Sequence, residues 1–162
     1  EATPPSPLES VIAQTYGQDM LDKITRHTVE TGELEPDHLA QLGASPEMVE
    51  DTVKHYEELT DKMLQPVGSC SAYMLNFLDA KEASAARSAI VSKNVGEVRR
   101  LGELARDRAA SMSHDQVKDF LSAAEAKQLR LRTVNRQVVV DLPQVGTVAW
   151  ATAVTNGLIS FR

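Results

Sequence analysis

Residues that interrupt helices recur at short intervals along residues 32–94, and they constrain what this chain can fold into. Glycine after an apolar helical run predicts a left-handed helix end, and proline predicts the first turn of the next helix. The interruptions are Gly32, Gly43, Pro46, Pro66 and Gly68. Between them the apolar residues follow helical spacing. The stretch therefore predicts a succession of helices.

The longest predicted helix runs from Pro46 to about Leu64. Its predicted apolar stripe consists of Met48, Val49, Val53, Tyr56, Leu59 and Met63. The charged positions of the same helix are Glu47, Glu50, Asp51, Lys54, Glu57, Glu58, Asp61 and Lys62. This division is typical of a helix with one face in a core and the other in water.

Helix starts and stops predict further helices on both sides of this one. Ser6 with Glu9, and Ser113 with Gln116, have the spacing of a capping box. The predicted helices cover about 7–16, 19–31, 36–42, a short segment around 73–78, 82–94, 95–112 and 113–130. Aromatic residues are only 4% of the chain, which favours packing through small and aliphatic side chains, in an elongated arrangement with a thin core.

The last thirty residues differ from the rest of the chain. Residues 133–142 are rich in valine and threonine, residues 145–154 alternate β-forming with small residues, and Asn156-Gly157 predicts a tight turn. We expect two or three strands. No charge occurs between Leu142 and Phe161. Two alternatives stay open: a hairpin that caps the helices, or an arm that adds to a partner.

The predicted fold class is therefore mainly α, a multi-helix protein with a short C-terminal β-hairpin or β-arm. The predicted organisation is a flexible lead-in over residues 1–7, a helical domain over 8–130 and a β-rich C-terminal segment over 131–162. Because the first residue is Glu1, we also expect a processed product or a piece of a longer precursor.

Charge is unevenly distributed along the chain. Residues 1–65 hold 14 carboxylates and 4 bases, a net charge of −10, whereas residues 66–162 hold 9 carboxylates and 13 bases, a net charge of +4. The acidic part would repel phosphates, so we do not expect a nucleic-acid binder. Such polarity is typical of head-to-tail self-association or of docking on a charged partner.

The sequence contains no spacing typical of a metal site or of an enzyme. Cys70 is the sole cysteine, which excludes an intrachain disulfide and favours a reducing compartment. The histidines at 27, 38, 55 and 114 never lie three or four residues apart, and no glycine-rich phosphate loop occurs. A nucleophile built on Cys70 would need partners from distant segments. We expect no enzyme activity, no cofactor, no signal peptide and no membrane span.

The arginines and the uncharged tail contain the predicted partner-binding residues. The arginines at 99, 100, 106, 108, 130, 132 and 136 alternate with Glu97, Glu103 and Asp107 and lack interleaved aromatics. This favours a solvated or subunit-bridging face over a nucleic-acid site. Trp150 is either a core residue or an interface anchor. The predicted set is Arg99, Arg100, Arg106, Arg108, Val138, Val140, Trp150 and Phe161.

Four short motifs follow one another along residues 32–101. They are Gly32-Glu33-Leu34; Leu42-Gly43-Ala44-Ser45-Pro46-Glu47-Met48-Val49 leading to Tyr56; Val67-Gly68 with Ala72-Tyr73; and Ala89-Ile90-Val91-Ser92-Lys93-Asn94 leading to Val98 and Leu101. In this order and spacing they resemble the capsid assembly (scaffolding) proteins of short-tailed bacteriophages. The acidic, proline-containing front of the chain is also similar to that family.

The chain departs from the family pattern in three places. The family tends to have a glycine pair where this chain has Val67-Gly68, and a tryptophan soon after the tyrosine where this chain has Phe77. Its capsid contact is commonly a basic helical C-terminus, whereas this chain ends in uncharged, β-like sequence. These departures leave the shell-binding element open.

The resemblance implies a non-enzymatic assembly protein that self-associates and binds the major capsid or portal protein. Such a protein is expected in the host cytoplasm and in the procapsid interior or virion. Two alternatives stay open, a virion-resident internal or shell-lining phage protein and a cytoplasmic helical adaptor.

Overall fold

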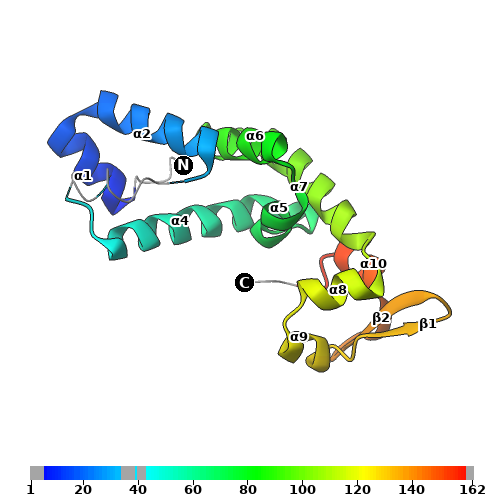
Figure 1. Cartoon of the computed structure of the whole chain (residues 1–162). Coiled ribbons are helices and arrows are strands. Elements are labelled where there is room, and N and C mark those ends of the chain that lie inside the picture. The colour runs from blue at the N-terminus through cyan, green and yellow to red at the C-terminus, as the bar shows by residue number, and fades with distance from the viewer. Residues whose placement is uncertain (1–5, 34–38, 40–42, 160–162) are drawn as a thin grey trace. The chain divides into compact units, whose positions relative to one another are not determined.

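A computed structural model describes residues 6–33, 39 and 43–159, and within them the chain is mainly helical with a small antiparallel sheet near the C-terminus (Figure 1). This confirms the predicted fold class. The chain forms two compact units that interleave in sequence. Unit 1 consists of Glu1–Met63 and Asp79–Val98, and unit 2 of Leu64–Leu78 and Arg99–Arg162. The predicted boundaries at residues 7 and 130 stay a prediction.

Unit 1 is built from helices whose ends lie within three residues of the predicted ones. They are α1 (Pro7–Tyr16), α2 (Gln18–Thr31), α4 (Pro46–Leu64), α6 (Ala80–Val91) and the first turn of α7 (Val95–Ala110). The last residue of α4, Leu64, already belongs to unit 2. Ser6 and Glu9 form the predicted capping box of α1. Gly32 ends α2 in the left-handed conformation at φ 76°. α1 packs on α2, and α2 packs on α6 (Figure 1).

The buried face of α4 departs from the predicted apolar stripe at Val53, and it also includes two threonines. Val53, predicted to be inside, is 45% exposed, whereas Thr52 and Thr60 are buried. Both threonine hydroxyls donate to the carbonyl four residues earlier, Thr52 to Met48 at 2.8 Å and Thr60 to Tyr56 at 2.7 Å. Because these bonds satisfy the hydroxyls, threonine can occupy the inner face of the helix.

The core of unit 1 includes a cluster of aliphatic side chains from α1 and from position 39. Leu8, Ile12 and Leu39 are buried, and the partly buried residues around them are Met20, Leu21, Ile24, Ala44, Met48 and Val49. The Tyr56 hydroxyl donates a hydrogen bond to the Glu9 carboxylate. Burial, and then the hydrogen bond and charge of Glu9, raise the pKa of Tyr56 above its usual range.

Unit 2 combines short helices with a three-stranded sheet. Its elements are η1 (Gln65–Val67), α5 (Ser71–Phe77), the remainder of α7, α8 (His114–Phe120), α9 (Ala123–Gln128), β1 (Arg132–Val134), β2 (Gln137–Leu142), β3 (Gly146–Ala149) and α10 (Trp150–Thr155). The strands lie in the order β1-β2-β3, with both pairs antiparallel. α10 packs against β2 and β3. The buried side chains include Leu64, Leu101, Ala105, Ala109, Val117, Val140, Trp150 and Val154.

The predicted helix over residues 113–130 is two helices. α8 begins at the predicted capping box of Ser113 and Gln116, but the chain becomes extended at Leu121, with ψ 147°. A second capping box, formed by Ser122 and Glu125, then starts α9. The Ser-x-x-Glu spacing of this second box is visible in the sequence and marks the break.

The strand predicted over residues 145–154 is correct only in its first half. β3 ends at Ala149 and α10 follows, so the prediction of strand for Trp150–Val154 is wrong. The reason is packing: Trp150, Ala153 and Val154 have helical spacing and are at most 1% exposed. Asn156 caps this helix. The predicted tight turn at Asn156-Gly157 is present, with Gly157 at φ 64°, but it ends α10 and does not join two strands.

Some predicted features lie outside the described residues. They are most of the lead-in, most of the brief helix at 36–42, and the end of the chain including Phe161. Among the helices that the structure describes, none combines the length and the apolar character needed to cross a membrane.

A matched pair of leucines tests the assignment of the core of unit 2. Leu101 on α7 is 1% exposed and Leu75 on α5 is 75% exposed. We expect Leu101→Ala to lower the free energy of unfolding by about 2–5 kcal/mol, because it leaves a cavity. Leu75→Ala should change it by less than about 0.5 kcal/mol. Urea denaturation followed by the fluorescence of Trp150 measures both, and equal effects would contradict the assignment.

The raised pKa of Tyr56 predicts a pH dependence of the stability of unit 1. Because the folded pKa lies above the unfolded value, the contribution of this group is complete below about pH 10 and is lost as the pH rises through the folded pKa. Tyr56→Phe should therefore lose less stability between about pH 10 and 12 than the unmodified chain. Urea melts followed by far-ultraviolet circular dichroism measure this, and parallel alkaline losses would refute it.

Candidate interaction surface

Two of the predicted partner-binding arginines bind backbone inside unit 2. The Arg106 side chain is 16% exposed; it donates to the Val67 carbonyl and forms an ion pair with Asp107 at 3.0 Å. Arg108 donates from Nη1 to the Phe77 carbonyl at 2.7 Å. Both residues therefore tie α7 to the segment containing η1 and α5. Their guanidinium groups stabilise the unit.

The remaining predicted residues are distributed between core and surface. On α7, Arg99 is half-buried and Arg100 exposed, and on β2, Val138 is half-buried. Val140 is 0% exposed and Trp150 1% exposed, so both side chains lie in the core, which for Trp150 is one of the two alternatives. Partner binding by either residue stays a prediction. The Trp150 indole donates to the Ala109 carbonyl at 2.9 Å. The physical reason is that a large apolar ring with a satisfied N–H is most stable in the core.

The exposed turn between β1 and β2 is a two-residue loop with an unusual conformation. Val134 pairs with Gln137, and the loop residues Asn135 and Arg136 have φ values of 50° and 65°. Positive φ at both central residues is typical of a type I′ hairpin turn, in which glycine is strongly preferred at the second position. Arg136 therefore occupies a backbone conformation that is unfavourable for it.

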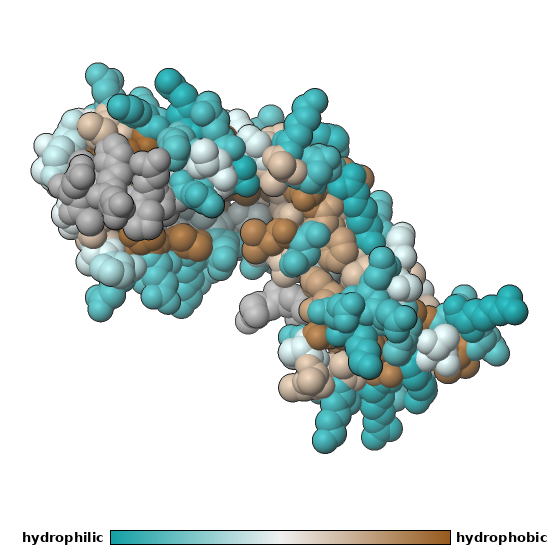
Figure 2. All heavy atoms as spheres, viewed as in Figure 1, coloured by the Kyte–Doolittle hydropathy of each residue, from teal (hydrophilic) through white to brown (hydrophobic). Residues whose placement is uncertain are grey.

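Basic side chains surround this hairpin. The segment 127–136 contains Lys127, Arg130, Arg132 and Arg136 and no carboxylate. In the view of Figure 2, hydrophilic residues cover the tip of the hairpin. The sequence predicts a solvated or subunit-bridging face for Arg130, Arg132 and Arg136, although none of the four residues belongs to the predicted partner-binding set. Their repetition at every second position, with Val134 between them, is a further sequence signal for this face.

One carboxylate organises the exposed face of the sheet. Arg132 on β1 donates from Nη2 to Asp141 Oδ1 at 3.3 Å and to Thr147 Oγ1 at 3.2 Å. The Thr147 hydroxyl donates to the same carboxylate oxygen at 2.6 Å, and Arg130 lies 4.0 Å from Oδ2. Side chains of all three strands thus meet at Asp141. Because Arg130 and Arg132 both face the single carboxylate of Asp141, the net charge of this face of the sheet is positive.

Unit 1 presents the opposite charge on the outer face of α4. Glu47, Glu50, Asp51, Glu57 and Glu58 are exposed there, with Lys54 and Lys62 as the exposed bases. Within the described part of the chain, none of these five carboxylates has an ion pair or a side-chain hydrogen bond. The misassigned Val53 lies among them.

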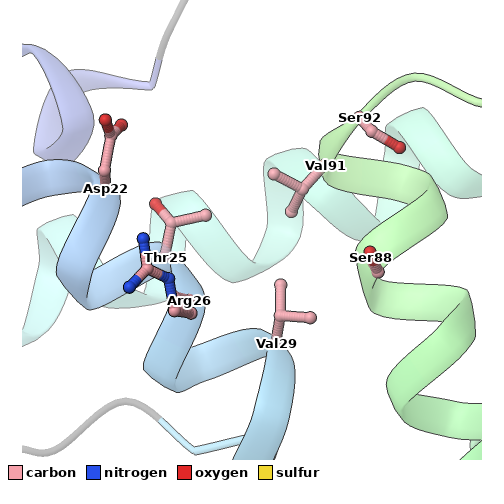
Figure 3. A pocket seen from close by; sticks show the side chains of 7 residues that line it. All are labelled: Asp22, Thr25, Arg26, Val29, Ser88, Val91 and Ser92. Carbon is pink, nitrogen blue, oxygen red and sulfur yellow. The ribbon is translucent and has the colours of Figure 1, made fainter.

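A shallow groove of about 270 Å³ lies between α2 and α6 of unit 1 (Figure 3). Its lining residues are Asp22, Thr25, Arg26, Val29, Ser88, Val91 and Ser92. Next to it, Arg87 holds the two helices together by donating from Nε to the Val29 carbonyl at 2.9 Å. One cation, one carboxylate and three hydroxyls around two valines can receive a side chain of a partner.

The described residues contain no group of three or more His, Cys, Asp or Glu side chains suited to hold a metal ion. Cys70 is buried at the start of α5. Burial, followed by the charge of Cys70, raises the pKa of the nearby Tyr73 above its usual range. The environment of Cys70 is therefore that of a buried side chain packed in a core. No family model, curated protein or solved structure matches the chain.

The conformation of Arg136 predicts a stabilising substitution. We expect Arg136→Gly to raise the free energy of unfolding of unit 2 by about 1 kcal/mol, because glycine adopts positive φ without a steric cost. Arg136→Ala removes the same side chain but keeps the strain, and should not stabilise. Urea melts followed by Trp150 fluorescence compare the two. A gain for alanine equal to that for glycine would show that charge, not backbone strain, sets the effect.

Proposed function

We propose that this chain is a non-enzymatic capsid assembly protein of the scaffolding type from a short-tailed bacteriophage. It self-associates and binds the shell protein, either the major capsid protein or the portal. It acts in the host cytoplasm and in the procapsid interior. The observation that carries the proposal is the set of motifs along residues 32–101 and the structural positions that they occupy.

The motif residues lie at the ends of helices. Gly32 ends α2, Pro46 begins α4, and Gly68 follows η1 in the left-handed conformation at φ 67°. Ser92 ends α6, and Asn94 accepts a hydrogen bond from the Glu97 N–H at 3.3 Å at the start of α7. Because helix ends fix helix lengths and order, a resemblance at these positions supports a resemblance in the arrangement of helices.

The separation of charge supports self-association. Unit 1 contains 17 carboxylates and 7 bases, and unit 2 contains 6 carboxylates and 10 bases, giving net charges of −10 and +4. Exposed ion pairs contribute up to about 1 kcal/mol each, so single contacts between copies are weak. Many weak contacts on a growing shell act together, and each can still be released afterwards.

A second candidate function is a virion-resident internal or shell-lining phage protein. The observation that favours it is the C-terminal segment. Trp150 and Val154 of that segment are part of the core of unit 2, whereas the resembled family commonly ends in a basic helix that contacts the capsid. A chain that uses this segment for folding can line a shell through another surface. The cytoplasmic helical adaptor has no comparable observation in its favour.

Assembly of purified components tests the proposal. The chain should sediment as a concentration-dependent mixture of monomer and oligomers, and it should raise the rate and yield of closed shells from the major capsid protein of the same phage. Light scattering and electron microscopy measure both, with an unrelated acidic helical protein of equal net charge as control. A strict monomer that leaves shell assembly unchanged would exclude the proposal.

The composition of mature particles separates the two candidates. A scaffolding protein should be abundant in procapsids and absent from finished particles, whereas a shell-lining protein should be present in both. Quantitative mass spectrometry of the two particle types decides between them.

A further inference from the structure

We infer that self-association joins a basic surface on unit 2 of one copy to an acidic surface on unit 1 of the next copy. The basic hairpin face consists of Arg130, Arg132, Val134 and Arg136. The acidic α4 face consists of Glu47, Glu50, Val53, Lys54, Glu57 and Glu58, with four carboxylates to one base. The inference rests on the proposed function and specifies its self-association contact.

The basic hairpin face is exposed and held in shape by the sheet. The Arg130 and Arg132 side chains are 77% and 47% exposed, and Val134 is 44% exposed. Arg132 and Val134 lie on the same side of β1, because side chains two residues apart share a face. The bonds of Arg132 to Asp141 and Thr147 position this side of the hairpin. The face therefore offers fixed cations next to an apolar centre.

The acidic α4 face has the complementary arrangement. Glu50 lies three residues before Val53 and Glu57 four residues after it, so the three side chains are neighbours along one side of the helix. On the hairpin, Arg132 and Arg136 lie two residues before and after Val134. The carboxylate–valine–carboxylate row of α4 thus has its counterpart in Arg132 and Val134 on one side of β1, with Arg136 in the adjoining turn. Guanidinium groups bind carboxylates in a bidentate geometry, and the valines exclude water between them.

Charge also determines which copy-to-copy contacts are disfavoured. Two acidic α4 faces repel one another, and so do two basic hairpin faces, which disfavours symmetric pairing through either surface. Each copy carries one surface of each kind, so the contact is head-to-tail and repeats from copy to copy in a ring or an open chain. Such repetition is what an assembly protein needs in order to cover a shell. Because both surfaces are exposed, added salt should weaken the contact.

A charge-swap experiment tests the contact. The hairpin variant is Arg130→Glu with Arg136→Glu, which spares Arg132 and its bonds within the sheet. The helix variant is Glu50→Lys with Glu57→Lys. We expect each variant alone to self-associate at least about tenfold more weakly by sedimentation, because attraction becomes repulsion. An equimolar mixture should recover association, since every hairpin then meets an α4 face of opposite charge.

A control with an equal change of charge elsewhere makes the result specific. Lys81→Glu with Lys118→Glu changes the net charge as much as the hairpin variant does, at exposed positions on α6 and α8. This variant should self-associate within about twofold of the unmodified chain. Circular dichroism establishes that all variants keep their helicity. A mixture that fails to recover, or a control that weakens association as much as the hairpin variant, would overturn the inference.

Other partners of the hairpin are outcomes of the same experiment. If the hairpin variant keeps self-association but loses binding to the shell protein, the hairpin contacts the shell and the inference is wrong. If nuclease treatment abolishes association of the unmodified chain, nucleic acid bridges the copies and the inference is also wrong. In either case shell assembly by the unmodified chain still supports the proposed function. If that chain neither self-associates nor promotes assembly, the proposed function itself fails.

Discussion

One buried hydrogen bond connects the C-terminal segment of unit 2 to its longest helix. The Trp150 indole N–H donates to the carbonyl of Ala109, which lies in the last turn of α7 and also accepts from the Met112 N–H at 3.3 Å. The ring is 1% exposed, so the bond satisfies a donor that water cannot reach. It fixes α10, on which β2 and β3 pack. The exposed hairpin is therefore held on a rigid base.

Helix ends were predictable because their chemistry is local. The capping boxes at Ser6 and Ser113 and the left-handed end at Gly32 each depend on residues within four positions of one another. The sequence contains all of that information. The box at Ser122, which divides a predicted helix into α8 and α9, follows the same rule. A short capping motif inside an apolar pattern is thus enough to break a helix.

The inner faces and the candidate surface were less predictable because they depend on distant segments. The inner face of α4 contains Thr52, whose hydroxyl is satisfied within the helix, while the more apolar Val53 is outside. Hydrophobicity alone selects the wrong residue in such a pair. Likewise, Trp150–Val154 is short enough to fit strand or helix, and its contacts with the sheet decide. The structure adds that Arg130 and Arg132 lie beside one carboxylate, that of Asp141, and that Arg136 occupies the turn next to them.

The charged side chains of the basic hairpin face and the acidic α4 face suit a reversible interface between copies better than a permanent one. Permanent interfaces bury a large apolar area, whereas the two complementary surfaces here have charged side chains around a single exposed valine. Val53 and Val134 are each less than half exposed, so they add little apolar area to a contact. In the function that we propose, affinity would then come from the number of copies held side by side. Such contacts would dissociate when the local concentration falls, which would permit release after a shell has closed.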